Sequence, residues 1–179
     1  KTTQAELLRE TFGFVLLGAG DALRELALED TELGRRVRQT INVEGRLVDP
    51  ELISKVIEER VAALPNDRGL IVDGYPRNLS QYGLFKKFWP KTGRGDYRVF
   101  IIGLSDDEAM KRLTRRVTCE DCGEVYIEGT VVQCAKCGGR LTKRPDDTPE
   151  AIQVRLQSFY SETEPMIRHL AERLWSATR

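Results

Sequence analysis

The stretch Gly69-Leu70-Ile71-Val72-Asp73-Gly74-Tyr75-Pro76-Arg77 carries the pattern that decides the fold. Its first half is a short apolar run bounded by glycines, which is typical of a strand buried on both faces of a parallel sheet. Its second half places a carboxylate, a glycine, a proline and an arginine where that strand ends. Because α/β proteins bind ligands at the carboxyl edge of their parallel strands, Asp73 to Arg77 is the first candidate site.

Outward from this stretch, strand and helix patterns alternate, which predicts an α/β fold with a parallel sheet flanked by helices. Residues 97–104 form a second apolar, β-branched run and predict another buried parallel strand. Three helices are predicted to begin at Asp49-Pro50, at the capping box Ser105-Asp106-Asp107-Glu108 and at Thr148-Pro149. Their inward stripes are predicted to be Ile53, Val56, Ile57, Val61 and Leu64; Met110 and Leu113; and Ile152, Leu156, Phe159 and Tyr160, with Pro165 bending or interrupting the third helix.

All four cysteines stand in two C-x-x-C-G knuckles, Cys119 with Cys122 and Cys134 with Cys137, separated by eleven residues. This spacing predicts a structural zinc site with four thiolate ligands, in which the glycine after each knuckle permits the backbone angles of the turn. Two disulfides, or four unrelated core thiols, are the alternatives. The paired spacing favours zinc because it accounts for every cysteine.

The length and the net charge of the chain indicate which classes of protein fit the sequence. A chain of 179 residues suits one domain with a full core. Its 28 basic and 28 acidic residues give no net charge, whereas a protein that mainly grips a nucleic-acid backbone usually has a basic excess. No apolar run has the length of a membrane span, and the first residues do not have the charged, then apolar, then small-residue pattern of a signal peptide. We therefore expect a cytoplasmic enzyme-sized domain with no nucleic-acid or membrane partner.

Several arginines flank the cysteine segment. Arg112 and Arg116 are four residues apart and are predicted to share a helical face, while Arg144 follows the segment and Arg155 lies on the next helix. Guanidinium groups match phosphate oxygens, so arginines aimed at one cleft from both sides of an insertion indicate a polyanionic ligand. Each arginine taken singly is more often a surface residue; the set carries the inference.

Four motifs in order give the chain a resemblance to a known family. They are Gly20-Asp21-Ala22-Leu23-Arg24, Asp73 to Arg77 followed by Gln81, the knuckles with Tyr126, and Arg144-Pro145-Asp146-Asp147 followed by Arg155. Together they resemble bacterial-type adenylate kinase with a zinc-bearing LID. The resemblance implies a P-loop NTPase-like fold and a core over 1–18, 49–114 and 148–179. It also implies an AMP-binding arm over 19–48 and a β-rich zinc LID over 115–147. It further implies a monomer that, with Mg²⁺, converts ATP and AMP into two ADP.

The resemblance also implies roles for individual residues. The AMP set is Ala19, Arg24, Arg46, Leu47, Val48, Gly74, Tyr75, Pro76, Arg77, Gln81, Arg144 and Arg155. The ATP set is Lys1, Thr2, Thr3, Arg116, Val125 and Tyr126. The catalytic set, whose positive charges would stabilise the transferring phosphoryl group, is Lys1, Arg77, Arg112, Arg116, Arg144 and Arg155.

The chain departs from the family pattern at three places. Lys1-Thr2-Thr3 resembles the tail of a phosphate-binding loop whose glycines and preceding first strand are missing, so we expect the sequence to be a fragment. Ala19 stands where the family has a threonine. The arginine pair is shifted by one residue; Arg116 keeps register with Arg112, but Arg115 could also serve. Two alternatives stay open: a non-catalytic or truncated zinc-ribbon protein on an α/β scaffold, and a related nucleoside monophosphate kinase.

Overall fold

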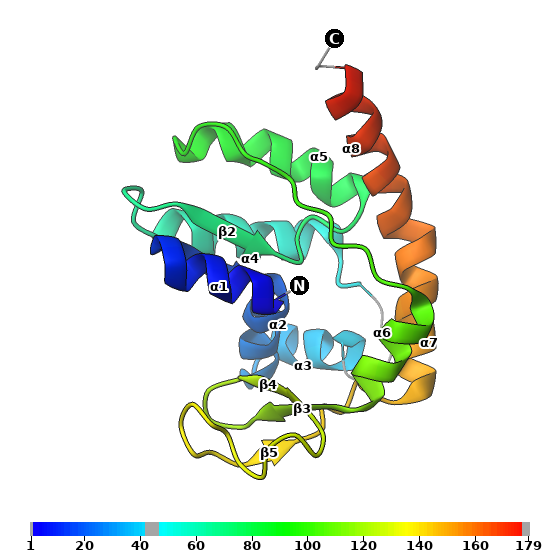
Figure 1. Ribbon diagram of the computed structural model, residues 1–179. Coiled ribbons are helices and arrows are strands. Elements are labelled where there is room, and N and C mark those ends of the chain that lie inside the picture. Colours follow the sequence, from blue (N-terminus) through cyan, green and yellow to red (C-terminus); the bar gives the residue numbers. More distant parts are fainter. Residues whose placement is uncertain (1, 42–46, 177–179) are drawn as a thin grey trace.

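The computed structural model describes residues 2–41 and 47–176, with 173–176 described by their backbone alone (Figure 1). The helices are α1 (Thr2–Phe12), α2 (Ala19–Leu28), α3 (Glu32–Gln39), α4 (Pro50–Ala63), α5 (Leu79–Phe88), the 3₁₀ turn η2 (Trp89–Thr92), α6 (Asp106–Thr114), α7 (Pro149–Ser158), the π turn η3 (Phe159–Thr163) and α8 (Glu164–Ser176). The strands are β1 (Val15–Gly18), β2 (Leu70–Asp73), β3 (Arg116–Cys119), β4 (Val125–Ile127) and β5 (Leu141–Thr142). None of the described helices is both long and apolar enough to cross a membrane.

A two-stranded parallel sheet places the first candidate site. β1 pairs with β2 in the register Val15 to Leu70 through Gly18 to Asp73. The sequence predicted β2 as a buried parallel strand; the strand and its parallel pairing are confirmed, but its four residues are half-buried rather than buried. The sequence did not predict β1. Two of the four β1 residues are leucines, which suit a helix as well as a strand, so the strand depends on its pairing with β2. The two strands end together, and α2 begins directly after β1.

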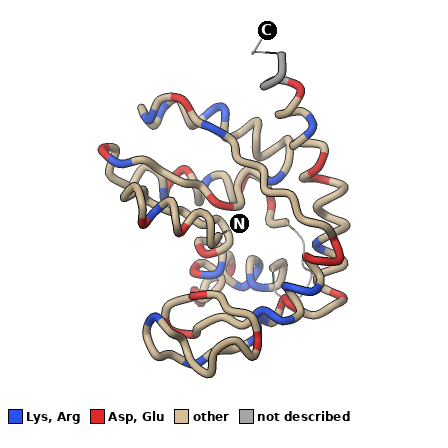
Figure 2. The backbone as a smooth tube through the Cα atoms, viewed as in Figure 1, with Lys and Arg blue, Asp and Glu red and all other residues tan. Residues whose placement is uncertain are grey.

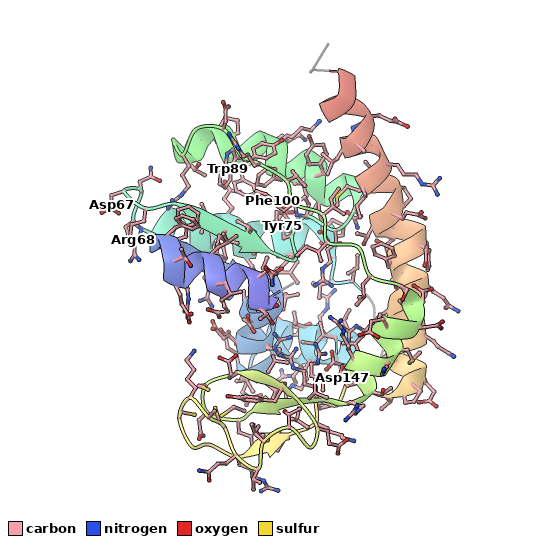
Figure 3. All side chains as sticks on the ribbon, viewed as in Figure 1. Asp67, Arg68, Tyr75, Trp89, Phe100 and Asp147 are labelled. Atoms are coloured by element: carbon pink, nitrogen blue, oxygen red, sulfur yellow. The ribbon has the colours of Figure 1, made fainter. Side chains whose placement is uncertain are left out.

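The predicted buried strand over residues 97–104 was wrong. This segment has no regular secondary structure, and its apolar side chains are exposed, with Phe100 at 79% (Figure 3). A strand needs a hydrogen-bonding neighbour, and neither sheet of the described chain includes the segment. The apolar pattern therefore could not supply the pairing that a buried strand requires.

The main hydrophobic core lies between α4, α5 and α8. Asp49 caps α4 as predicted, accepting hydrogen bonds from the amides of Glu51 and Leu52, and α4 buries Ile53, Ile57 and Val61. Each such side chain contributes about 1.5–3 kcal/mol when fully buried. The aromatic face of α5 completes the core, and the Phe85 ring stacks on Trp89 at 5.1 Å. A second, smaller core joins Ala27, Val37 and Val48.

The other two predicted helix starts are confirmed, but the third stripe is shorter than predicted. Ser105 caps α6 and Thr148 caps α7. Ile152 is fully buried, whereas Phe159 and Tyr160 are 38% and 48% exposed. The α-helix gives way to the π turn η3 just before Pro165, which lacks an N–H group and crowds the preceding turn. The wider turn changes the register, so residues beyond Ser158 no longer continue the inward stripe.

Residues 115–147 form a small β-rich unit at the opposite end of the molecule from α5 (Figure 1). Its sheet is antiparallel with the order β4-β3-β5. The chain enters this unit from α6 and leaves it into α7. The unit is therefore inserted between two helices, with both of its connections near each other. The residue boundaries of core, arm and LID stay predictions.

Candidate active site

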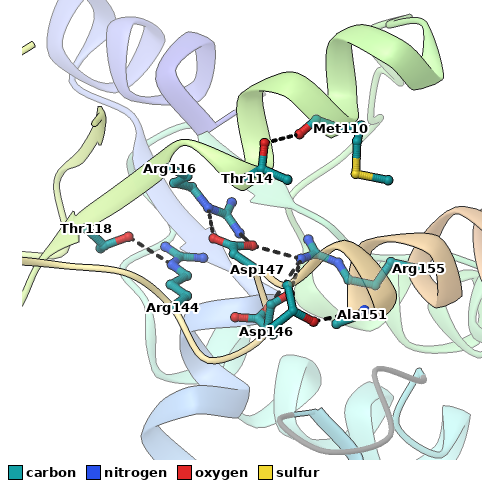
Figure 4. Close-up of polar contacts among 10 residues, drawn as sticks. Met110, Thr114, Arg116, Thr118, Arg144, Asp146, Asp147, Ala151 and Arg155 are labelled. Carbon is teal, nitrogen blue, oxygen red and sulfur yellow. Dashed lines mark hydrogen bonds and ion pairs between the residues drawn. The ribbon is translucent and has the colours of Figure 1, made fainter. Parts of the chain in front are cut away.

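A buried carboxylate joins two of the predicted arginines. Arg116 begins β3, and its Nε and Nη2 donate to Oδ2 and Oδ1 of Asp147 at 2.7 and 2.6 Å. Arg155, on α7, donates from Nη1 to Oδ1 of Asp147 at 3.3 Å (Figure 4). The Asp147 side chain is only 2% exposed. This carboxylate therefore links the start of the inserted unit to the helix that follows it.

Arg116 and Arg155 belong to a larger group of five arginines that influence one another's charges. Burial is the main cause that lowers the pKa of Arg144 to about 10, and the charges of Arg116 and Arg24 lower it further. Burial also lowers the pKa of Arg77, and Arg155 and Arg24 add to the effect while Asp73 opposes it. Arg77 and Arg144 thus share Arg24 as a repelling neighbour. We name Arg24, Arg77, Arg116, Arg144 and Arg155 the arginine cluster.

The arginine cluster has the chemistry of an anion site. Its cations come from α2, the loop after β2, the two ends of the 115–147 unit and α7. Figure 2 shows basic positions gathering where that unit meets the helices above it. The pKa values of Arg77 and Arg144 are lowered mainly by burial and further by neighbouring arginines, and a bound polyanion would relieve this second, repulsive part. Guanidinium groups gathered in this way match the oxygens of a phosphate chain.

The loop after β2 fixes Arg77 from several sides. Its backbone N–H donates to Oε1 of Gln81 at 2.7 Å, and its Nε donates to the Gly74 carbonyl at 2.8 Å. Gly74 has φ +83°, a left-handed conformation that favours glycine. Tyr75 donates its hydroxyl proton to the Gln81 carbonyl at 3.2 Å and contacts the Ser54 hydroxyl at 2.7 Å. The loop is therefore tied to both α4 and α5.

Other predicted AMP residues lie on α2, in the stretch before α4, on α5 and within the loop itself. Ala19 is 3% exposed at the start of α2, and Val48 is 6% exposed in the second core. Arg24 forms an ion pair with Asp21 at 2.5 Å, while Gln81 is 2% exposed. Leu47 is half-buried, as is Pro76, which follows Tyr75 through a cis peptide bond. Lys1 and Arg46 lie outside the described residues.

The predicted ATP residues fall into two groups. Thr2 lies at the start of α1, and its hydroxyl donates to Oδ2 of Asp73 at 2.9 Å, while Thr3 is exposed beside it. Val125 and Tyr126 lie on β4, within the inserted unit. The Tyr126 hydroxyl is directed at Cys134 and the Ala135 amide rather than at the arginine cluster.

The structure separates Arg112 and Arg115 from Arg116. The predicted helical face shared by Arg112 and Arg116 was wrong, because α6 ends at Thr114 and Arg116 already belongs to β3. Arg112 instead pairs with Glu108 at 2.5 Å and is 60% exposed. Arg115 donates to the Glu128 carbonyl at 3.3 Å. Of the three arginines, the structure brings Arg116 into the cluster.

Two partners of the site were not identified from the sequence. The sequence did not predict a role for Asp147, yet its carboxylate orients Arg116 and Arg155. Thr118 accepts a hydrogen bond from Nε of Arg144 at 3.0 Å. One signal in the sequence could have identified Asp147: two consecutive carboxylates, Asp146 and Asp147, stand close to an arginine and just before a predicted helix. Nothing in the sequence pattern singles out Thr118, because its contact depends on the pairing of β3 with β5.

The four cysteines form a centre that fits zinc. Their sulfur atoms all lie within 4.8 Å of one another, and the Cys119–Cys137 and Cys122–Cys134 pairs are each 3.5 Å apart. A tetrahedral Zn²⁺ with Zn–S bonds of ~2.3 Å requires sulfur separations of about 3.8 Å. The glycines after the knuckles, Gly123 and Gly138, have φ +73° and +77°, as the knuckle turns predict. The thiols are not joined in disulfides, so the geometry suits a metal centre.

Comparison with known proteins agrees with these features. The profile of the family described as adenylate kinase matches residues 1–174. An adenylate kinase of Dehalococcoides mccartyi strain BAV1 is 34% identical over 173 residues, covering 94% of this chain and 80% of the relative. Those of Archaeoglobus fulgidus and Thermodesulfovibrio yellowstonii are each 33% identical, covering 93% and 97% of this chain and 79% and 82% of the relatives. The chain therefore belongs to the adenylate kinase family.

Proposed function

We propose that this protein catalyses the reversible transfer of a phosphoryl group between ATP and AMP, giving two molecules of ADP. The family membership supports this reaction, and the arginine cluster is the observation that carries it. Arg77, Arg116, Arg144 and Arg155 come from four parts of the chain, and two of them have pKa values lowered by burial and by neighbouring cations. A phosphate chain would compensate these charges.

The acceptor would bind beside the loop after β2. Arg24 and Arg77 would hold the AMP phosphate, and Gln81 would select the adenine edge. Gln81 is buried and accepts a hydrogen bond from the Arg77 backbone amide. These contacts support a fixed distance between the residue proposed to recognise the adenine and the residue proposed to bind the phosphate. Ala19, Leu47, Val48 and the predicted Arg46 would line the same side.

Arg116, Arg144 and Arg155 would stabilise the charge on the phosphoryl group in flight. Phosphoryl transfer requires positioning and charge stabilisation more than acid or base catalysis, and preorganised guanidinium groups supply both. Asp147 supports this role because it holds Arg116 through two hydrogen bonds. Thr2, Thr3, Val125, Tyr126 and the predicted Lys1 would contact ATP.

Asp73 and Thr2 fit a site for Mg²⁺ with ATP. The carboxylate and the hydroxyl lie 2.9 Å apart at the carboxyl end of β2, and oxygen atoms of this kind are the ligands that Mg²⁺ prefers. When bound, the cation would neutralise part of the phosphate charge. The chain's own contribution is to hold these two oxygen donors at the edge of the sheet that also carries Arg77.

We further propose that residues 115–147 act as a LID. Closure of this unit would exclude water from the transferring phosphoryl group and prevent hydrolysis of ATP. The unit has both connections at one end, which suits a hinged movement, and it contributes Arg116 and Arg144 to the cluster. Zinc would be structural here, holding the knuckles together without taking part in the reaction.

The test is the disproportionation of ADP by the purified protein with Mg²⁺, measured as ATP formation. Arg77→Ala should nearly abolish turnover because the Arg77 guanidinium is proposed to hold the acceptor phosphate. Arg168→Ala is the matched control, since Arg168 is a 73%-exposed arginine on α8 that pairs only with Glu164 among its described ion pairs. Equal turnover in the two variants would contradict the proposed acceptor site.

A further inference from the structure

The Tyr126 hydroxyl lies at the cysteine centre and has two partners there. Tyr126 is the middle residue of β4, opposite Val117 of β3. The backbone N–H of Ala135 donates to its hydroxyl oxygen at 3.1 Å. The same oxygen lies 3.5 Å from Sγ of Cys134. Cys134 is 2% exposed, so this contact is on the inner side of the second knuckle.

The chemistry of these partners fixes the direction of both hydrogen bonds. A backbone amide can only donate, so the Tyr126 oxygen must be the acceptor for Ala135. The single hydroxyl proton then remains for the sulfur. A cysteine that ligates a metal is a thiolate and can only accept, so Tyr126 would donate to Cys134 in the metal-bound protein.

Apart from the 3.5 Å sulfur contact between Cys137 and Cys119 of β3, the second knuckle has few other connections to the sheet. Between β4 and β5 the chain contains turns and no strand. The hydrogen bonds from Cys134 N to Gly139 O and from Gly138 N to Cys134 O stay within the knuckle. Lys136 pairs with Glu124 at 3.3 Å, but both side chains are more than a third exposed. Among the described contacts, the half-buried Tyr126 thus supplies a side-chain link between the knuckle and β4.

We propose that Tyr126 is a positioning residue of the metal centre, which orients the Cys134 thiolate and holds the second knuckle against the sheet. This inference rests on the proposed zinc site. Partners that hydrogen-bond to metal ligands orient them and tune their charge, and their loss typically weakens metal binding about 10- to 100-fold. Tyr126 would do so while lying on the strand that connects the knuckle to Arg116 through β3.

The test compares Tyr126→Phe with Tyr160→Phe. Both changes remove one hydroxyl and keep the ring, but the Tyr160 hydroxyl donates to Asp106 outside the cysteine centre. Zinc affinity is measured by competition with a chromophoric chelator. Tyr126→Phe should bind zinc about 10- to 100-fold more weakly than the wild type, and Tyr160→Phe should match the wild type. In Co²⁺-substituted protein, the sulfur-to-metal charge-transfer band should move to lower energy only in Tyr126→Phe.

The outcomes separate this inference from the zinc site itself. Unchanged zinc affinity and an unchanged Co²⁺ band in Tyr126→Phe would overturn the role of Tyr126 while leaving the zinc site intact. A wild type that binds no zinc would overturn both. Thermal unfolding of the metal-free proteins checks the fold: a loss of stability there equal to the loss in the zinc form would assign Tyr126 to packing and overturn the inference.

Discussion

At the scale of single residues, the structure distinguishes three arginines that sequence register could not separate. Arg116 reaches Asp147, whereas Arg115 reaches the Glu128 carbonyl and Arg112 reaches Glu108. Arg116→Ala should lower kcat about 10²-fold or more, since the loss of a preorganised charge-stabilising donor typically costs that much. Arg115→Ala is the neighbouring control and should cost less than tenfold. A larger loss in Arg115→Ala than in Arg116→Ala would contradict the proposed assignment.

Asp147 gives a second prediction at this scale. Asp147→Asn keeps the shape of the side chain but removes the charge that compensates Arg116 and Arg155. We expect the free energy of unfolding, measured in urea, to fall by about 2 kcal/mol, because breaking a buried charged hydrogen bond leaves its partner uncompensated. A polyphosphate ligand should stabilise the variant more than it stabilises the wild type. Equal stabilisation of both would show that the carboxylate does not offset the cluster's charge.

The elements show where local patterns were sufficient. The caps at Asp49, Ser105 and Thr148 are short-range features, and each predicted helix begins where its cap stands. The knuckle glycines are equally local. Strands were less predictable because a strand requires a hydrogen-bonding partner. β1 forms because it pairs with β2, whereas residues 97–104 have the same apolar character but no such pairing. The sequence also did not show that α6 ends at Thr114. Because of that end, Arg112 and Arg116 do not share a helical face.

The cysteine centre gives a prediction for one element. Residues 119–137 contain few large apolar side chains, and binding of a structural Zn²⁺ contributes on the order of 10 kcal/mol. Cys134→Ser, or removal of the metal by a chelator, should therefore unfold the 115–147 unit, seen as a loss of amide hydrogen-exchange protection in β3 and β4. AMP binding at the loop after β2 should remain within a few-fold of the wild type. A parallel loss of AMP affinity and of protection in β2 would refute this separation of unit and core.

At the scale of the whole molecule, the candidate site is an assembly of distant segments. The sequence could predict its members singly, since Arg77, Arg144 and Arg155 each stand in a distinctive motif. It could not predict their electrostatic coupling, because the pKa of Arg77 is lowered first by burial and then by Arg155 and Arg24, and these effects arise only when the chain folds. Asp147 and Thr118 were missed for the same reason: their function depends on contacts made by the 115–147 unit after folding.

The central claim is that the arginine cluster binds the phosphates of both nucleotides at once. Calorimetric titration with a bisubstrate analogue, two adenosines joined by five phosphates, tests it most directly. We predict one ligand per chain, with affinity that falls as salt is raised and falls at least tenfold in Arg116→Ala, but is unchanged in Arg168→Ala. Absence of binding by the wild type, or equal affinity in wild type and Arg116→Ala, would contradict the account.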